Sequence, residues 1–178
     1  MKINLLYNAF DLIMKTTKPF IYRGSDRPIF TQILLDCRDG TVTATALDGV
    51  KMVRLTVEAE SGTEVGQMLI PWMRPIGKNS LYAQITDDGK NITVETDASV
   101  LSFKKVVGEY ADVRRLFNGN KEPTATVWCD PKQLATALST FSDKVKIDFY
   151  TPLSGLVISD AVCRQDAVVM PVRPPETV

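Results

Sequence analysis

The chain has 178 residues, 44% hydrophobic and 24% charged, which is typical of a packed soluble protein with one large domain or a domain and a smaller unit. Lys plus Arg equal Asp plus Glu at 21 each, which excludes a uniformly basic protein that coats DNA but not a local basic face. The sequence has no signal-peptide pattern and no apolar run near the roughly 20 residues of a membrane helix, so we expect a cytoplasmic protein with no membrane partner.

The first part of the chain predicts a helix followed by three strands. Leu5, Ala9 and Leu12 share one helical face over Asn4–Thr17, with Asn4 as the N-cap, and the helix ends before Pro19. The segments that follow are rich in β-branched residues or alternate apolar with polar residues, and glycine-containing turns separate them. The predicted strands are Ile29–Cys37, Thr41–Leu47 and Lys51–Glu58.

A second group of elements follows the same order. Val65–Ile70 predicts a strand, and Pro71–Ser80 predicts a helix with Pro71 at its first position. Pro75, one turn later, indicates that this helix is short or kinked. The strands predicted next are Leu81–Thr86, Ile92–Thr96 and Val100–Val107.

A third group begins after a linker at Phe117–Glu122. Thr124–Trp128 predicts a strand, and Asp130 followed by Pro131 is a cap with a first-turn proline, which predicts a helix start. The apolar stripe of that helix is Leu134, Leu138 and Phe141. The strands predicted after it are Val145–Tyr150, Leu156–Ser159 and Ala167–Val172.

These groups are three copies of one motif, a strand and a helix followed by three strands, although the first copy leaves little room for its leading strand. The pattern predicts an α+β fold with antiparallel sheets and helices on one face. Two packed copies make a whole domain, so we expect a complete domain over residues 1–117 and a half domain over residues 121–178.

The residue types argue against an enzyme. The chain has no histidine, which removes Ser-His-Asp and Cys-His nucleophile pairs and histidine metal sites. Its three cysteines, Cys37, Cys129 and Cys163, are far apart and are interpreted as small core residues. The glycines form no phosphate-binding loop. We therefore expect no catalytic residue, no metal and no cofactor, with Asp or Lys chemistry as the weaker hypothesis.

Four segments resemble a known family in the same order along the chain. Residues 46–52 (ALDGVKM) are similar to ATDGHRL, and residues 110–116 (YADVRRL) to FPDYRRV, in the middle domain of the bacterial sliding clamp, the DNA polymerase III β subunit. Residues 127–134 (VWCDPKQL) resemble the start of the clamp's last domain, and residues 168–173 (VVMPVR) resemble its terminus VVMPMRL. The resemblance implies a DNA-clamp fold with a middle domain and a shortened last domain.

In that family a pocket between the middle and last domains binds short peptides. The resemblance implies that such a pocket binds Leu or Phe anchors from DNA polymerase or repair proteins, since methionine adapts its shape to varied partners. Leu47 and Val50 differ from the family's Thr and His. The alternative interpretations are a plain hairpin turn at 48–49 and a core strand at 168–172. The candidate residues are Leu47, Gly49, Val50, Met52, Val168, Met170, Pro171 and Arg173.

Family helices face the phosphate backbone of duplex DNA, so basic residues of the three helical patterns are candidates for sequence-independent contact. The alternative is that they lie on solvated helix faces or near helix C-termini. The candidates are Lys15, Lys18, Arg74, Lys78, Lys132 and Lys144.

Two functions follow from the resemblance. The first is a sliding-clamp-like accessory protein of DNA replication or repair, a processivity factor that binds partner peptides and contacts or encircles DNA. The second is a clamp-derived interaction module or regulator that does not encircle DNA. Half a domain exposes strand edges and an apolar face, which predicts a homo-oligomer, either a dimer or a tetramer with twelve motifs.

Overall fold

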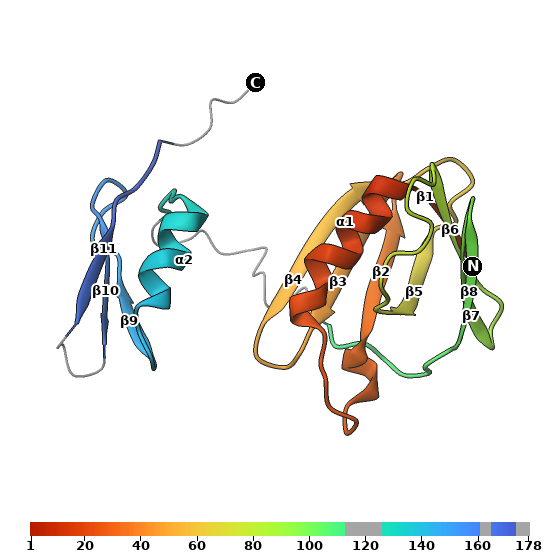
Figure 1. Cartoon of the computed structure of the whole chain (residues 1–178), viewed down its shortest axis with the longest axis horizontal. Helices are drawn as coiled ribbons and strands as arrows, with labels where there is room; N and C mark the ends of the chain where they lie inside the picture. Colours follow the sequence, from red (N-terminus) through yellow and green to blue (C-terminus); the bar gives the residue numbers. More distant parts are fainter. Residues whose placement is uncertain (113–125, 161–164, 174–178) are drawn as a thin grey trace. The chain divides into compact units, whose positions relative to one another are not determined.

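The computed structural model describes residues 1–112, 126–160 and 165–173 and divides into two compact units after Asp112 (Figure 1). We call residues 1–112 unit 1 and the described residues from 126 onwards unit 2. The predicted linker Phe117–Glu122, the domain boundary placed there, and Cys163 lie outside the described residues.

Within the described ranges, no helix is long and apolar enough to cross a membrane. Unit 1 holds most of the regular structure. In chain order its elements are β1 (Lys2–Leu6), α1 (Tyr7–Thr17), the 3-10 turns η1 (Lys18–Phe20) and η2 (Pro28–Thr31), β2 (Gln32–Arg38), β3 (Thr41–Leu47), β4 (Met52–Glu58), β5 (Gly66–Pro71), β6 (Tyr82–Asp87), β7 (Asn91–Thr96) and β8 (Ser99–Lys104). Unit 2 contains α2 (Pro131–Ser139), β9 (Val145–Asp148), β10 (Leu156–Asp160) and β11 (Asp166–Val169).

Unit 1 is built by an exchange of strands between its two repeats, β1 to β4 and β5 to β8. β1 leads the first repeat but pairs with β6 of the second, with Ile3 opposite Ile85. β5 leads the second repeat but pairs with β2 of the first, with Ile70 opposite Ile33. The two antiparallel sheets therefore have the orders β1-β6-β7-β8 and β4-β3-β2-β5. Neither repeat completes its own sheet, so the two repeats form one folding unit.

The core of unit 1 lies between these sheets and α1, which crosses the β2–β4 sheet in Figure 1. Phe10, Ile13 and Met14 of α1 are buried, and the buried hydroxyl of Thr17 donates to the Ile13 carbonyl at 2.7 Å. The inward side chains of β2 and β3 alternate with outward ones, as the period of a half-buried strand requires. The α+β class with antiparallel sheets that the sequence predicts is confirmed.

The first predicted helix is three residues too long at its start. Residues 2–6 form β1, with Ile3 and Leu5 buried, and the helix begins at Tyr7 without a side-chain cap. The amide of Asn4 donates to the Ser61 carbonyl at 2.9 Å instead of capping a helix. Leu5 fits both an apolar helical face and an alternating strand, and the pairing with β6 decides between them.

The second predicted helix, at 71–80, is wrong. β5 continues through Pro71, and residues 72–80 contain no helix. Pro75 has no N–H to donate, and its ring would clash with the carbonyl four residues earlier. The Trp72 Nε1–H instead donates to the Met14 carbonyl at 2.8 Å, which ties this loop to α1. We call residues 72–80 the Trp72 loop.

The third predicted group differs less. α2 begins at Pro131 as predicted, and the Asp130 carboxylate accepts the N–H groups of Lys132 and Gln133. The strand predicted over Thr124–Trp128 is not formed at residues 126–128, where its described part lies.

In the first group, the predicted strand Ile29–Cys37 begins with η2 and becomes extended only at Gln32.

Two cysteines pack against apolar side chains, as predicted for core residues. Cys37 is buried on the inward face of β2, and Cys129 is partly buried against the core of unit 2. Burial, followed by the charge of Asp36, raises the pKa of the Cys37 thiol to about 11. This thiol is therefore protonated at neutral pH and serves as a packing group.

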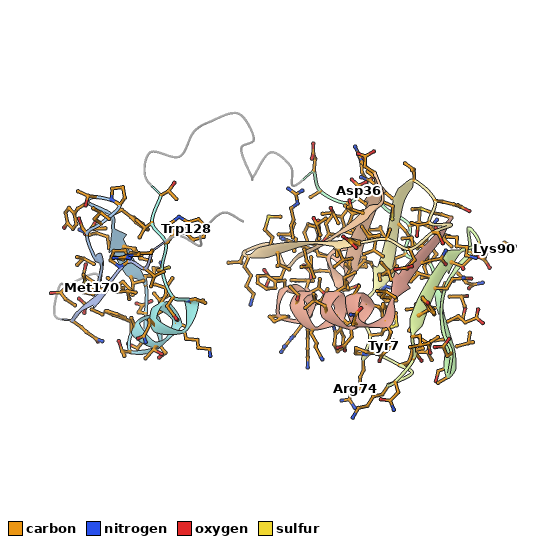
Figure 2. The ribbon with its side chains drawn as sticks, turned by 90° about the horizontal axis from the view of Figure 1, so that it is seen from above. Tyr7, Asp36, Arg74, Lys90, Trp128 and Met170 are labelled. Carbon is orange, nitrogen blue, oxygen red and sulfur yellow. The ribbon has the colours of Figure 1, made fainter. Side chains whose placement is uncertain are left out.

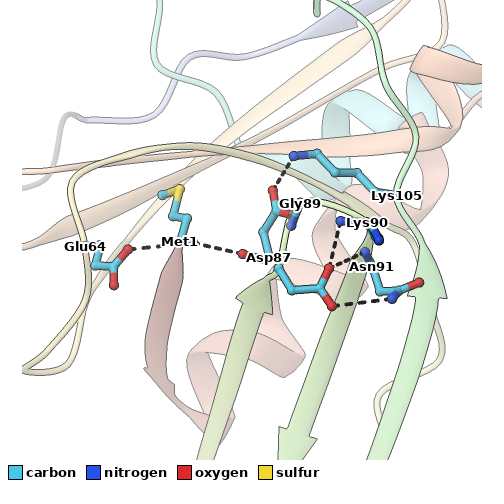
Figure 3. Close-up of polar contacts among 8 residues, drawn as sticks. Met1, Glu64, Asp87, Gly89, Lys90, Asn91 and Lys105 are labelled. Carbon is cyan, nitrogen blue, oxygen red and sulfur yellow. Dashed lines mark hydrogen bonds and ion pairs between the residues drawn. The ribbon is translucent and has the colours of Figure 1, made fainter.

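An ion pair closes one end of the β1-β6-β7-β8 sheet (Figure 3). The Lys105 ammonium lies 2.6 Å from the Asp87 carboxylate, and the Gly89 N–H donates to the same carboxylate at 2.8 Å. The Asp87 backbone bonds to both the amino group and the carbonyl of Met1. Burial alone would raise the pKa of Asp87, but Lys105 and the Gly89 N–H hold this pKa below its ordinary value of 3.8.

Replacing Lys105 with Met should destabilise unit 1 by about 1–3 kcal/mol at pH 7, because the largely buried Asp87 carboxylate, 10% exposed, loses its charged partner. The lowered folded-state pKa means that the pair stabilises the fold above pH 3.8 and that this stability is lost as the pH falls through the folded-state pKa. Urea unfolding at pH 7 and pH 3 measures both effects. Lys104→Met, an exposed neighbour, is the control, and equal unfolding free energies for the two variants would contradict the prediction.

Candidate functional site

The predicted peptide residues of unit 1 surround the β3–β4 hairpin turn. The Asp48 carboxylate accepts the N–H groups of Val50 and Lys51 at 3.0 Å each, and these bonds lower the pKa of Asp48. Gly49 supplies a positive φ of 96° in the turn. Leu47 and Met52, the last and first residues of the strands, are paired across the hairpin, and Val50 at the tip is 96% exposed.

Two aromatic residues beside this turn were not predicted from the sequence. The ring of Phe30 meets the ring of Tyr110 edge-on, with centroids 6.1 Å apart. The Tyr110 hydroxyl donates to the Thr45 carbonyl on β3 at 3.5 Å, and burial raises the pKa of Tyr110 to about 12. The pair therefore lies against β3 close to Leu47. Tyr110 lies in a segment that the resemblance already marked, but Phe30 carried no signal of its own.

The predicted peptide residues of unit 2 lie on the outward side of β11 and just after it. Val168 and Met170 are 59% and 66% exposed, whereas Val169 between them is buried. The alternation excludes the core interpretation for Val168 and Met170 within unit 2. A Cβ atom added at Gly155 would lie 2.5 Å from the Val168 Cγ1 and 3.4 Å from the Met170 Sδ. A side chain at position 155 would therefore require Val168 to move, while Met170 lies at ordinary contact distance.

The residues after Met170 continue along another part of unit 2. The Val172 N–H donates to the Trp128 carbonyl at 2.8 Å, which holds the end of the described chain against the segment before α2. Pro171 is partly buried, and Arg173 is exposed. Of the predicted peptide residues, Arg173 is thus presented to solvent from an anchored backbone.

Three of the predicted DNA-contacting residues belong to adjoining parts of unit 1. The Lys18 ammonium lies 5.5 Å from the ring centre of Trp72, which begins the Trp72 loop. Arg74 and Lys78 are exposed on that loop, and Arg74 projects away from the ribbon in Figure 2. Their predicted helix is absent, yet the loop occupies a place beside α1 because of the Trp72 bond to Met14. These three cations are thus carried by the segment after α1 and by the loop that the Trp72 bond ties to this helix.

The other predicted DNA contacts are less concentrated. Lys15 pairs with Asp11 on the same helix at 2.5 Å, which offsets part of its charge. In unit 2, Lys132 lies in the first turn of α2, and Lys144 lies just before β9, so neither is at a helix C-terminus. Both are exposed. The described residues contain no group of three His, Cys, Asp or Glu that could hold a metal ion.

Solved structures with this arrangement are bacterial sliding clamps. A DnaN sliding clamp (DNA polymerase III subunit beta) from Pseudomonas aeruginosa bound to griselimycin matches with a TM-score of 0.77 and 16% identity, covering 97% of this chain and 51% of that one. The DNA polymerase sliding clamp from Bacillus subtilis matches with a TM-score of 0.76 and 13% identity, covering 96% and 49%. The chain has the sliding-clamp fold. The DNA polymerase III beta chain from Streptococcus pneumoniae gives 0.73 at 14% identity, covering 97% and 50%.

The clamp-fold match extends over nearly the whole chain, but the chain spans about half the length of these three structures. No protein-family model and no curated protein matches the sequence. The clamp fold is therefore recognised from the arrangement of strands at low identity, as the four resembling segments indicated. The individual site residues remain predictions.

Replacing Gly49 with Ala should lower the unfolding free energy of this clamp-fold chain by about 1 kcal/mol, because φ is positive there and the new Cβ would strain the turn. Chemical denaturation followed by circular dichroism measures the change. Val50→Ala at the neighbouring exposed position should alter stability by less than about 0.5 kcal/mol. A Gly49→Ala variant as stable as the wild type would show that the turn tolerates a side chain.

Proposed function

We propose that the chain is a sliding-clamp-like accessory protein of DNA replication or repair, which binds short peptides of polymerase-type partners and contacts duplex DNA. The observation that carries the proposal is the clamp fold over 96–97% of the chain, with TM-scores of 0.73 to 0.77.

Peptide binding is supported by one apolar surface in each unit. In unit 1 the surface is Leu47 and Met52 with the aromatic pair Phe30 and Tyr110 beside them. In unit 2 it is Val168 and Met170 above Gly155. Exposed methionine and valine side chains on a rigid strand accept Leu or Phe anchors of a short linear motif, because methionine adapts to different shapes. Each unit thus presents an apolar surface of its own to which such an anchor could bind.

Replacing Met170 with Asp should weaken peptide binding at least tenfold, because a charge replaces an apolar contact at the proposed site. Fluorescence anisotropy of a labelled peptide with Leu and Phe anchors measures the affinity. Val65→Asp, an equally drastic change at an 81% exposed position of unit 1, is the matched control and should bind as the wild type does. Unchanged affinity of a folded Met170→Asp variant would exclude Met170 from the site.

DNA contact is supported by exposed cations just after α1 and on the Trp72 loop. Lys18, Arg74 and Lys78 are exposed, and none of them forms an ion pair with an acidic side chain of the described residues, whereas Lys15 is paired with Asp11. Phosphate contacts from such side chains are independent of base sequence and weaken as salt rises. The overall charge balance of the chain is zero, so the proposed binding depends on where these cations lie and not on the net charge.

Replacing Arg74 and Lys78 together with Glu should weaken binding to duplex DNA. It should also reduce the slope of the logarithm of the binding constant against the logarithm of the salt concentration by about 2, because two phosphate contacts are removed. Filter binding across a salt series measures both. Lys90 and Lys104, which are exposed on the β6–β7 turn and on β8, are reversed together as the control for net charge. Equal losses in the two double variants would show that only net charge matters.

Encirclement is tested separately on nicked circular DNA. A protein that encircles the duplex should stay on the circle and leave when the circle is linearised, because only a free end allows a ring to slide off. Peptide binding without any retention on the circle would favour the interaction module over the clamp.

A further inference from the structure

Unit 1 shows how a leading strand of this motif is held on both of its sides. On one side the Lys2 and Asn4 carbonyls of β1 accept the N–H groups of Glu64 and Glu60, which follow β4, at 2.9 Å each. On the other side β1 pairs with β6 of the second repeat. β1 is therefore enclosed between residues 60–64, which follow β4 in the same repeat, and β6 of the other repeat.

The segment 126–130 of unit 2 corresponds to β1 and has only the first of these two neighbours. Trp128 stands three residues before α2, as Asn4 stands three residues before α1. The Trp128 carbonyl accepts the N–H of Val172, which follows β11 as Glu60 follows β4. No described strand pairs with the other side of this segment. In an extended segment the backbone groups of Val127 and Cys129 face that side, because successive residues bond in opposite directions.

The strand that would pair with such a segment, β9, also has one edge without a described partner strand. In unit 1 the corresponding strands are β2, which follows α1, and β6, which follows the Trp72 loop. Both lie inside their sheets, because β5 pairs with β2 and β1 pairs with β6. In unit 2 the equivalent strand, β9, lies at the edge of the three-stranded sheet β11-β10-β9. An exposed strand edge is a template for pairing with another chain.

The packing of unit 2 shows the same incompleteness. α1 buries four residues, whereas α2 has no buried residue, and its apolar side chains Leu134 and Leu138 are only partly covered. Ile147 of β9 is partly exposed, while Ile33 and Ile85 on the equivalent strands of unit 1 are fully buried. In unit 1 the second repeat covers the corresponding apolar side chains, and the described part of unit 2 has no such second repeat.

We propose that two copies of this chain associate through unit 2 by reciprocal strand exchange. Residues 126–130 of one protomer pair antiparallel with β9 of its partner, and β9 receives the same segment in return. Both open positions belong to one unit and complement each other, so a single two-fold axis satisfies both. The arrangement repeats between two chains what β1 and β5 do within unit 1. It involves neither the proposed peptide surfaces nor the proposed DNA contacts.

The test is the mass of the 178-residue chain in sedimentation equilibrium over a wide range of concentration. We expect a reversible dimer of twice the 19.7 kDa chain mass. Val127→Pro removes an N–H on the open side and should shift the wild-type dimer to a monomer. Thr126→Pro is the matched control, because its N–H faces the other side, and it should remain a dimer. Circular dichroism verifies that both variants are folded.

Hydrogen exchange of the wild-type chain provides a second measurement that does not depend on any variant. The amides of residues 126–130 and of β9 should gain protection together as the dimer forms and lose it together on dilution. A monomer at every concentration would overturn the proposal. So would a dimer that both proline variants retain, or a dimer whose formation leaves the exchange of β9 unchanged.

Discussion

The pairing of β1 with β6, matched by that of β5 with β2, is the constraint on which unit 1 depends. The two pairings tie together residues that are far apart in the chain, as in the Ile3–Ile85 pair. Closing such long loops costs entropy, and the burial of inward side chains from both sheets offsets that cost. Because each sheet is completed only by the other repeat, the fold is cooperative across the whole of residues 1–112.

Unit 2 contains the same motif without that reciprocal partner in the described structure. The buried hydrophobic residues of its described ranges are Leu156, Ile158 and Val169, and the side chains of α2 cover them only in part. A single sheet and one helix bury little apolar surface, so the described part of unit 2 gains less stabilisation from burial than a complete domain does. The same motif is therefore self-sufficient as a pair and incomplete as a single copy.

The surfaces proposed for function depend on this scaffold in a simple way. β11 and the residue after it alternate exposed Val168 and Met170 with buried Val169, so the buried residue fixes the direction of the exposed ones. The Trp72 loop carries Arg74 and Lys78 beside α1 because the Trp72 indole bonds to Met14 and Met73 is buried in the core. These dependences on pairing and burial explain how the clamp fold is retained at 13–16% identity, since many different apolar residues satisfy the same pattern.

The sequence by itself determined the local elements whose signals agree. Thr41–Leu47 alternates in a way that only a strand satisfies, and Asp130 with Pro131 specifies a helix start through a capping carboxylate and a fixed φ. The exposed turn at Asp48 and Gly49 was also predictable, because glycine adopts its φ without strain. The tertiary structure decided the rest. Residues 4–6 fit a helix as well as a strand until β6 pairs with them, and the place of Phe30 beside Tyr110 depends on chain segments that are distant in the sequence. Such choices are made by contacts between distant residues, and local residue patterns carry no record of which distant partner a strand will meet.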